Sequence, residues 1–351
     1  MNKTDNLKFV KNFSEEELIE YFSSINEKPY RAKQLYDWLY VKESLDFDEM
    51  LNFSKSLREH LKDNFEITTV KQKEVQHSSS GTKKLLLETY DNKFIESVII
   101  PDGERVTLCL STQVGCPLDC KFCATGLMGY KRNLTPGEIV DQYIHSKSIG
   151  SKITNIVYMG MGEPLLNFKN TLESLRIFTD TRLETLSRNR ITVSTSGITP
   201  KIIELADSGL RVQLALSLHS TFEDIRSKIM PINVKYDLKS VLIAVEYYLK
   251  MTDTKITYEY TMLKDLNDRD EDIKSLTKLC KRMPSKINII PFNSIKHMSP
   301  GGLSAELEPT SRNKLMLFAD KLRNNGITVM VRETQGDDIA AACGQLAVKS
   351  L

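Results

Sequence analysis

The sequence is poor in the residues and runs that mark secreted or membrane proteins. Its 351 residues include only six cysteines, five histidines and one tryptophan. No apolar stretch of signal-peptide length opens the chain, and no run approaches the length that spans a bilayer. Six cysteines in so long a chain do not suggest a disulfide framework, which is typical of small secreted domains. We therefore expect a soluble, cytoplasmic protein with no membrane partner.

An excess of charge of one sign is missing as well. The chain carries 48 Lys and Arg against 46 Asp and Glu, which gives a formal net charge of +2. This balance neither requires nor excludes a nucleic-acid partner, because a local basic patch can bind phosphate on a near-neutral protein. With 40% hydrophobic and 27% charged residues, the composition indicates an ordinary globular chain.

The pattern of apolar and polar residues predicts three regions. Residues 1–65 show helix starts, such as Ser14 before three glutamates, and are predicted to form a small helical accessory domain. Residues 66–100 alternate polar and apolar side chains, as connecting strands do. In residues 101–351 short apolar strands alternate with helices, which indicates an α/β fold with a parallel barrel. The loops that follow the strands of such a barrel form its active site.

The most informative motif is GCPLDCKFCATG, in which Cys116, Cys120 and Cys123 are separated by three and then two residues. Three thiolates in one loop can hold a [4Fe-4S] cluster by three of its irons and leave the fourth iron open. Zinc is a competing interpretation, although structural zinc sites normally add a fourth ligand and the nearest histidine is His145. Plain structural thiols are the third interpretation.

Further polar motifs follow the predicted strands. GMGEP, STSG, SLH and PFN each come at a strand end, so we expect them to meet the cysteine loop on one face of the barrel. Cys109, within VTLCLST, has two interpretations, a reactive thiol or a small buried apolar residue. Cys280 lies on an apolar helical face and is expected in the core.

Seven motifs in order resemble the RlmN/Cfr family of RNA adenine methyltransferases, within the radical S-adenosylmethionine superfamily. They are TLCLSTQVGCPLDCKFCATG, MGMGEPLLN, VSTSG, ALSLH, PINVKY, INIIPFN and RETQGDDIAAACGQLA. The resemblance covers nearly the whole chain, including EKPYRAKQLYDWLY near its start. It implies a partial (β/α)6 TIM-like barrel that uses a [4Fe-4S] cluster and S-adenosylmethionine.

The resemblance also implies roles for single residues. Cys116, Cys120 and Cys123 would be the cluster ligands. Cys343 would take a methyl group from one S-adenosylmethionine, and a 5′-deoxyadenosyl radical from a second would take a hydrogen from that methyl group. After the carbon radical has added to adenine C2 and the C2 proton and an electron have been lost, Cys109 would attack the Cys343 sulfur, release methyladenosine and form a disulfide. The residues that would bind S-adenosylmethionine are Gly162, Glu163, Ser194, Ser217, Leu218, His219 and Asn293.

The acceptor of the C2 proton stays open between Glu96 and Cys109. The apolar neighbours of Glu96 in FIESV are expected to raise the pKa of its carboxyl group toward that of a general base. The C-terminal segment around Cys343 is expected to be ordered by cofactor or RNA.

The implied partners are RNA and an electron donor. The family methylates C2 of adenosine 2503 in 23S rRNA and of adenosine 37 in tRNA, and a flavodoxin-like protein is expected to supply electrons. Candidate RNA contacts are Arg31, Lys33, Lys121, Lys131 and Arg132, although exposed basic residues are often only solvated.

Three alternative functions are compatible with parts of the pattern. A Cfr-type enzyme would methylate C8 of the same ribosomal adenosine, but the motifs QVGC, GMGEP and ACGQLA favour the enzymes that methylate C2. A noncatalytic, zinc-bound RNA-binding protein would contain zinc, lack the brown colour of a cluster and show no cofactor turnover. A radical enzyme that acts on protein or small molecules would leave the Cys109 and Cys343 motifs unexplained.

Overall fold

The structure, a computed structural model, describes residues 8–183 and 186–348, so the first seven residues of the expected accessory domain lie outside it. Within these ranges the main element is a ten-stranded sheet with the order β14-β13-β12-β11-β10-β9-β6-β5-β4-β3. Its seven strands from β14 to β6 run parallel, and β5, β4 and β3 continue it in antiparallel pairing. The strands are β3 (Val70–His77), β4 (Lys83–Thr89), β5 (Phe94–Asp102), β6 (Arg105–Cys109), β9 (Asn155–Tyr158), β10 (Ile191–Thr195), β11 (Gln213–Ser217), β12 (Ile256–Met262), β13 (Ser285–Pro291) and β14 (Val329–Val331).

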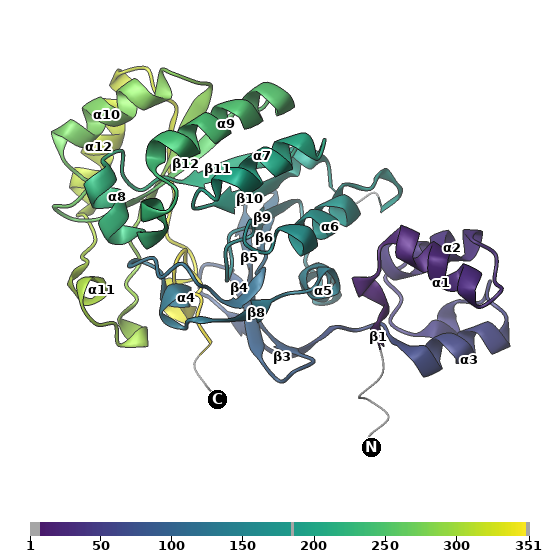
Figure 1. Cartoon of the computed structure of the whole chain (residues 1–351). Helices are drawn as coiled ribbons and strands as arrows, with labels where there is room; N and C mark the ends of the chain where they lie inside the picture. Colours follow the sequence, from purple (N-terminus) through teal and green to yellow (C-terminus); the bar gives the residue numbers. More distant parts are fainter. Residues whose placement is uncertain (1–7, 184–185, 349–351) are drawn as a thin grey trace.

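In the described part of the chain, six longer helices connect successive parallel strands, and Figure 1 shows them as a layer outside the sheet. They are α5 (Pro136–Ser148), α6 (Phe168–Thr179), α7 (Thr199–Asp207), α9 (Leu238–Thr252), α10 (Asp270–Cys280) and α12 (Arg312–Asn324). Every residue of β12 is buried, as expected for a parallel strand that is covered on both faces. The prediction of a partial barrel with six strand–helix units is confirmed, and β14 follows the sixth helix.

The N-terminal helices form a lobe beside the barrel, drawn in purple in Figure 1. They are α1 (Glu15–Ser24), α2 (Tyr30–Tyr40) and α3 (Lys55–Asn64), with β1 (Lys8–Phe9) paired to β2 (Phe65–Glu66). Ser14 and Glu17 form the capping box that begins α1, as the sequence predicts. Domain boundaries at residues 65 and 100 stay predictions, and β3 to β5 belong to the main sheet.

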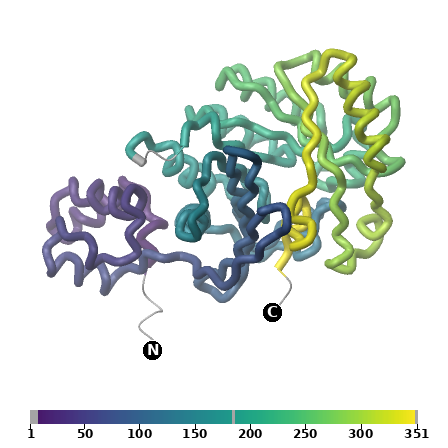
Figure 2. The backbone as a smooth tube through the Cα atoms, turned by 180° about the vertical axis from the view of Figure 1, so that it is seen from behind, coloured from purple at the N-terminus to yellow at the C-terminus, as the bar shows by residue number. Residues whose placement is uncertain are grey.

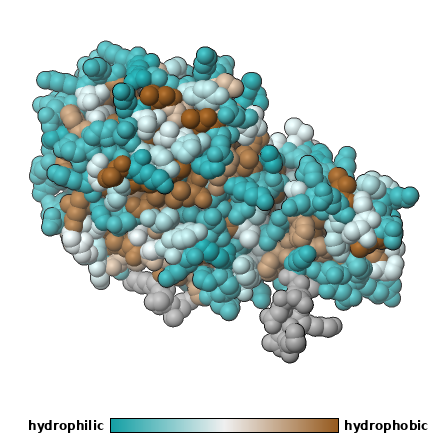
Figure 3. All heavy atoms as spheres, in the orientation of Figure 1, coloured by the Kyte–Doolittle hydropathy of each residue, from teal (hydrophilic) through white to brown (hydrophobic). Residues whose placement is uncertain are grey.

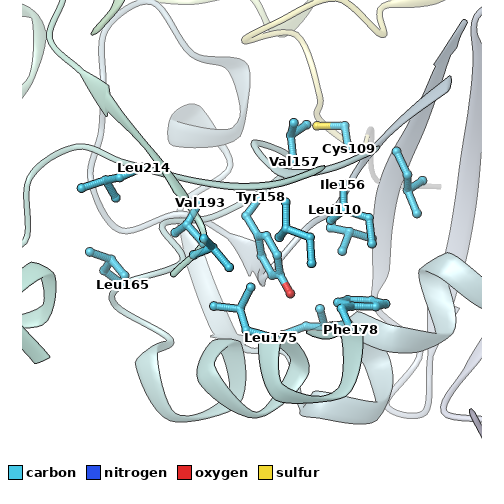
Figure 4. Packing of buried hydrophobic residues seen from close by; sticks show 14 of the residues in the cluster. Cys109, Leu110, Ile156, Val157, Tyr158, Leu165, Leu175, Phe178, Val193 and Leu214 are labelled. Carbon is cyan, nitrogen blue, oxygen red and sulfur yellow. The ribbon is translucent and has the colours of Figure 1, made fainter. Parts of the chain in front are cut away.

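Side-chain alternation along β6 separates the barrel interior from the helix layer. In Figure 4, Leu110 and Tyr158 point toward the helix that carries Leu175. Cys109 and Val157 point to the other side of the sheet. Strand geometry therefore places the Cys109 thiol inside the barrel.

The C-terminal segment, residues 336–348, runs beside the antiparallel strands, as the yellow tube in Figure 2 shows. The Asp338 carboxylate accepts hydrogen bonds from the Ser78 and Ser79 hydroxyls, and Lys84 Nζ donates to the Ala340 carbonyl. These contacts bring Cys343 to the barrel.

The surface carries hydrophilic atoms around a band of hydrophobic atoms in the middle of the face shown in Figure 3. Among the described residues, no helix has the length and apolar character needed to cross a membrane.

Candidate active site

A tight hairpin presents the cysteine loop. Strand β7 (Gln113–Gly115) pairs with β8 (Tyr130–Asn133), and the short helix α4 (Ala124–Leu127) follows the third cysteine. Gly115 has φ +75°, and a Cβ there would lie 1.8 Å from the Gly129 carbonyl oxygen. Only glycine therefore allows the two backbones to approach this closely.

Cys116, Cys120 and Cys123 line one cavity of about 160 Å³, which we call the cluster cavity. Burial raises the pKa of the Cys116 thiol to about 12 and that of Cys120 well above its ordinary value. Such thiols ionise on binding a cationic centre. Among the residues that the structure describes, no three Cys, His, Asp or Glu side chains meet as a single metal ion requires. In a [4Fe-4S] cluster each cysteine binds a different iron, so the three sulfurs do not have to meet at one point. The three cysteines therefore fit such a cluster.

Glu163 in GMGEP ties the cavity wall together. Its Oε2 accepts hydrogen bonds of 2.8 Å from both the backbone N–H and the hydroxyl of Ser196, and its Oε1 accepts one from the Leu165 N–H. Burial raises the pKa of this carboxyl group. The Thr195 side chain is a further hydrogen-bond partner, so Thr195, Ser196 and Leu165 together hold this carboxylate in place. Gly162, at φ +102°, has no room for a Cβ, which would lie 2.6 Å from Gln113.

His219 is a neutral, fixed ring in the cavity wall. Its Nδ1 accepts a hydrogen bond of 2.9 Å from the Thr261 N–H, so the neutral ring carries its proton on Nε2. Burial, and then the charge of Arg226, lower the pKa of His219 to about 3. The ring packs edge to face against Phe122, with centroids 4.5 Å apart.

The other predicted cofactor residues lie in three places. Ser194 and Ser217 line the cluster cavity together with Gly162, Glu163 and His219. Leu218 is fully buried in the hydrophobic core and does not line the cavity. Asn293 lines a second cavity of about 300 Å³ inside the barrel, the barrel cavity. Its Nδ2 donates to the Cys343 carbonyl at 3.0 Å.

Arg226, on α8 (Glu223–Ile229), is a residue that sequence reasoning missed. Its side chain is fully buried, and its guanidinium donates to the carbonyls of Ser196, Ser217 and Leu218. Burial lowers the pKa of Arg226 to about 10. Arg226 thereby fixes the loops after β10 and β11.

The two remaining candidate thiols lie close enough to influence each other. Cys343 is exposed and lines both cavities, whereas Cys109 is buried. Burial, and then Cys343, raise the pKa of Cys109 to about 12. Both are free thiols in the structure, so the Cys109–Cys343 disulfide implied by the resemblance is not present. The backbone of the Cys343 segment also reaches the cluster loop, because the Ala124 N–H donates to the Gly344 carbonyl at 2.7 Å.

Glu96 is buried behind the C-terminal segment. Its carboxylate is 3.0 Å from Lys84 Nζ and accepts a hydrogen bond of 3.0 Å from the Ala347 N–H. Burial raises its pKa, and Lys84 opposes that effect. Glu96 lines neither the cluster cavity nor the barrel cavity.

Both arginines among the basic candidates for RNA contact have structural partners. Arg31 donates to the Asn52 carbonyl, and Arg132 forms ion pairs with Asp91 and Glu138. These ion pairs raise the pKa of Arg132 against the effect of its burial.

The three lysines differ among themselves. Lys121 pairs with Asp119, while Lys33 and Lys131 are exposed. Lys33 and Lys131 are therefore the better candidates for phosphate contacts.

Comparisons with known proteins identify the family of this chain. Residues 9–67 match the ribosomal RNA large subunit methyltransferase N-terminal domain, and residues 110–277 match the radical SAM superfamily. A probable dual-specificity RNA methyltransferase RlmN from Christiangramia forsetii is 42% identical, over 99% of this chain and 98% of the relative. The chain belongs to the RlmN family. A protein of the same name from Thermotoga neapolitana is 43% identical, over 98% of each chain.

A solved structure agrees with the assignment to the RlmN family. The crystal structure of a radical SAM methyltransferase from Sphaerobacter thermophilus is 36% identical, covers 96% of this chain and 98% of its own, and superposes with a TM-score of 0.88. The family and fold predicted from the motifs are confirmed. The chain is an enzyme whose cofactors are a [4Fe-4S] cluster and S-adenosylmethionine.

Proposed function

We propose that this chain methylates C2 of adenosine 2503 in 23S rRNA and C2 of adenosine 37 in tRNA. The observation that carries the proposal is that Cys343 lines the same cavity as Cys116, Cys120 and Cys123. The relatives are named dual-specificity RNA methyltransferases, which supports two classes of RNA substrate. The proposed place of action is the cytoplasm, where both RNAs are found.

The residues around the cluster cavity divide the work of binding. Cys116, Cys120 and Cys123 would hold the cluster, and Glu163 and His219 would shape the pocket for S-adenosylmethionine. When bound, these cofactors supply a methyl group and the radical that an unreactive aromatic C–H bond requires. The buried wall keeps water away from that radical.

Cys343 is the proposed methyl acceptor. Its thiol loses a proton, and the thiolate sulfur forms a bond to the methyl carbon while the sulfonium C–S bond breaks. Cys109 is the proposed resolving thiol: once the adduct has lost the C2 proton and one electron, the electron going to the oxidised cluster, the Cys109 thiolate would attack the Cys343 sulfur. The sulfur–carbon bond would break with its electron pair going to the base, the former methyl carbon would take up a proton to become the new methyl group, and a disulfide would form. Two electrons then reduce the disulfide, and a flavodoxin-like donor is the proposed source.

Glu96 is the proposed acceptor of the C2 proton. Its raised pKa suits a general base, but Lys84 and the Ala347 N–H now occupy its oxygens. This role therefore requires that the segment around Ala347 move when RNA binds.

The proposal is tested with anaerobically reconstituted enzyme, S-adenosylmethionine, reductant and two RNAs, a 23S rRNA fragment and an unmodified tRNA. Mass spectrometry should find a methyl group at C2 of both adenosines. A C8 product would support the Cfr-type alternative. Formation of 5′-deoxyadenosine without RNA methylation would mean that the substrate is another molecule.

The C343A variant should lose RNA methylation completely, because it has no sulfur to accept the methyl group. The matched control is C280A, since Cys280 carries a half-buried thiol at the end of α10, and its backbone carbonyl accepts a hydrogen bond from the Ser285 hydroxyl. C280A should keep the wild-type rate in the same assay. Methylation by C343A would remove the central step of the proposed reaction.

A further inference from the structure

Arg332 occupies a position that the proposed reaction does not yet use. It follows β14 and, like Cys343, lines both the cluster cavity and the barrel cavity. Its backbone N–H donates to the Ile289 carbonyl at 2.9 Å, which anchors it to the neighbouring strand β13. The base of this side chain is therefore fixed by the sheet.

The guanidinium group of Arg332 faces sulfur. Its Nη1 lies 3.4 Å from Cys343 Sγ, within the distance of a hydrogen bond to sulfur. Cys343, followed by Glu259 and Cys109, raises the pKa of Arg332 against the effect of burial. Arginine stays protonated in proteins, so the sulfur has a permanent cation beside it.

The other charged groups around this pair come from neighbouring strands. Glu259, on β12, is buried and accepts a hydrogen bond of 2.7 Å from Asn288. Lys286, on β13, lines the barrel cavity and influences Glu259. Cys109, on β6, is the second thiol. Arg332 is thus the cation that directly contacts Cys343, and Glu259 is an acidic group that influences Arg332.

The backbone of Cys343 is held separately from its sulfur. Asn293 Nδ2 donates to the Cys343 carbonyl, and Asn293 Oδ1 accepts from the Thr334 hydroxyl at 3.1 Å. Loss of the Arg332 guanidinium would therefore change the surroundings and direction of the thiol more than the course of the chain.

We propose that Arg332 is a positioning residue for Cys343, which directs its Sγ toward the cluster cavity and places a cation against the sulfur. The identity of Cys343 as methyl acceptor rests on the proposed function. The effect of Arg332 on the thiol does not, because it concerns the protein alone.

The test measures the reactivity of the Cys343 thiol in cluster-loaded, full-length enzyme without S-adenosylmethionine or RNA. Iodoacetamide is added between pH 6 and pH 9, and mass spectrometry quantifies alkylation of the peptide that carries Cys343. R332Q should react about tenfold more slowly than wild type at pH 7, because its Cys343 sulfur has no cation beside it. R332K, which keeps the charge, should recover most of the rate.

The matched control is R312Q, because the Arg312 guanidinium pairs with exposed Glu333 at the surface. Its profile should equal that of wild type. Circular dichroism and cluster absorbance establish that each variant is folded and loaded. An unchanged Cys343 profile in folded R332Q, with or without weaker binding of S-adenosylmethionine, would overturn the proposal. Altered Cys343 reactivity with no RNA methylation by wild type would instead reject the proposed substrate and leave the role of Arg332 intact.

Discussion

Burial decides whether a single residue near the cluster cavity is charged or neutral. His219 is a clear case, because its pKa of about 3 keeps the ring neutral at physiological pH. The left-handed backbone at this residue, φ +52°, points the ring at the cavity and Nδ1 at the Thr261 N–H. A neutral donor beside the proposed cofactor site adds no positive charge to it.

His219 should make the folded chain sensitive to acid. An unfolded histidine binds a proton below about pH 6.5, and folded His219 does not until about pH 3, so stability falls as the pH falls between these values. This residue alone should cost about 1.4 kcal/mol of unfolding free energy between pH 7.5 and pH 5.5. Urea denaturation of cluster-free protein at both values should show a smaller loss for H219N. The control is H77N, because His77 is exposed, and this variant should lose as much stability between the two pH values as wild type. An equal loss in H219N and H77N would contradict the assignment to His219.

At the residue scale the sequence predicts the thiols better than the arginines. The spacing of Cys116, Cys120 and Cys123 is local, so it survives in the sequence as a motif. Arg226 and Arg332 have partners that are backbone carbonyls and a sulfur brought together only by the barrel. Because most arginines are exposed, no pattern along the chain distinguishes these two.

Among the elements, the β7–β8 hairpin sets the position of the cysteine loop. Its two strands meet at Gly115 and Gly129, both with positive φ, but only Gly115 is crowded by the opposite backbone. A substitution at Gly129 therefore tests only the cost of a positive φ, whereas one at Gly115 adds the cost of a clash with the opposite backbone.

We expect G115A to bind far less iron after reconstitution than G129A. Alanine at positive φ costs about 1–2 kcal/mol at either position. At residue 115 its Cβ would also overlap the Gly129 carbonyl, and the hairpin would have to open. Iron and sulfide analysis of both variants, with wild type alongside, measures the difference. Equal iron content in the two variants would show that the close approach is not required.

The elements themselves were largely predictable, since helix starts such as the capping box of Thr135 and Glu138 are local signals. The attachment of β3 to β5 was not. Alternation identifies them as strands, but their union with the barrel depends on the pairing of β5 with β6. That choice of partner is tertiary and leaves no local pattern.

The whole molecule is joined by a buried ion pair between lobe and barrel. Lys11, just before α1, contacts Asp141 on α5, and both side chains are nearly inaccessible to solvent. Asp141 also accepts hydrogen bonds of 2.7 Å from the backbone N–H and hydroxyl of Thr69. The lobe is thereby fixed relative to the barrel.

K11M should lower the free energy of unfolding by about 3–5 kcal/mol, because it leaves the Asp141 charge buried without its cation. K11M/D141N should lose less, since the amide carries no charge. K55M is the surface control: the Lys55–Glu59 pair is exposed and should contribute less than about 1 kcal/mol. Urea denaturation compares the three. A loss in K11M as small as that in K55M would mean that the ion pair does not hold the lobe.

Strand β6 has a further consequence for how this chain can vary. Cys109 faces the interior of the barrel because its pairing with Val98 and Val157 fixes the strand alignment. Substitutions along β6 would change size or polarity one position at a time. An insertion or deletion of a single residue before Cys109 would instead turn the thiol into the helix layer and bring a leucine inside. Length, more than composition, is therefore what this strand has to preserve.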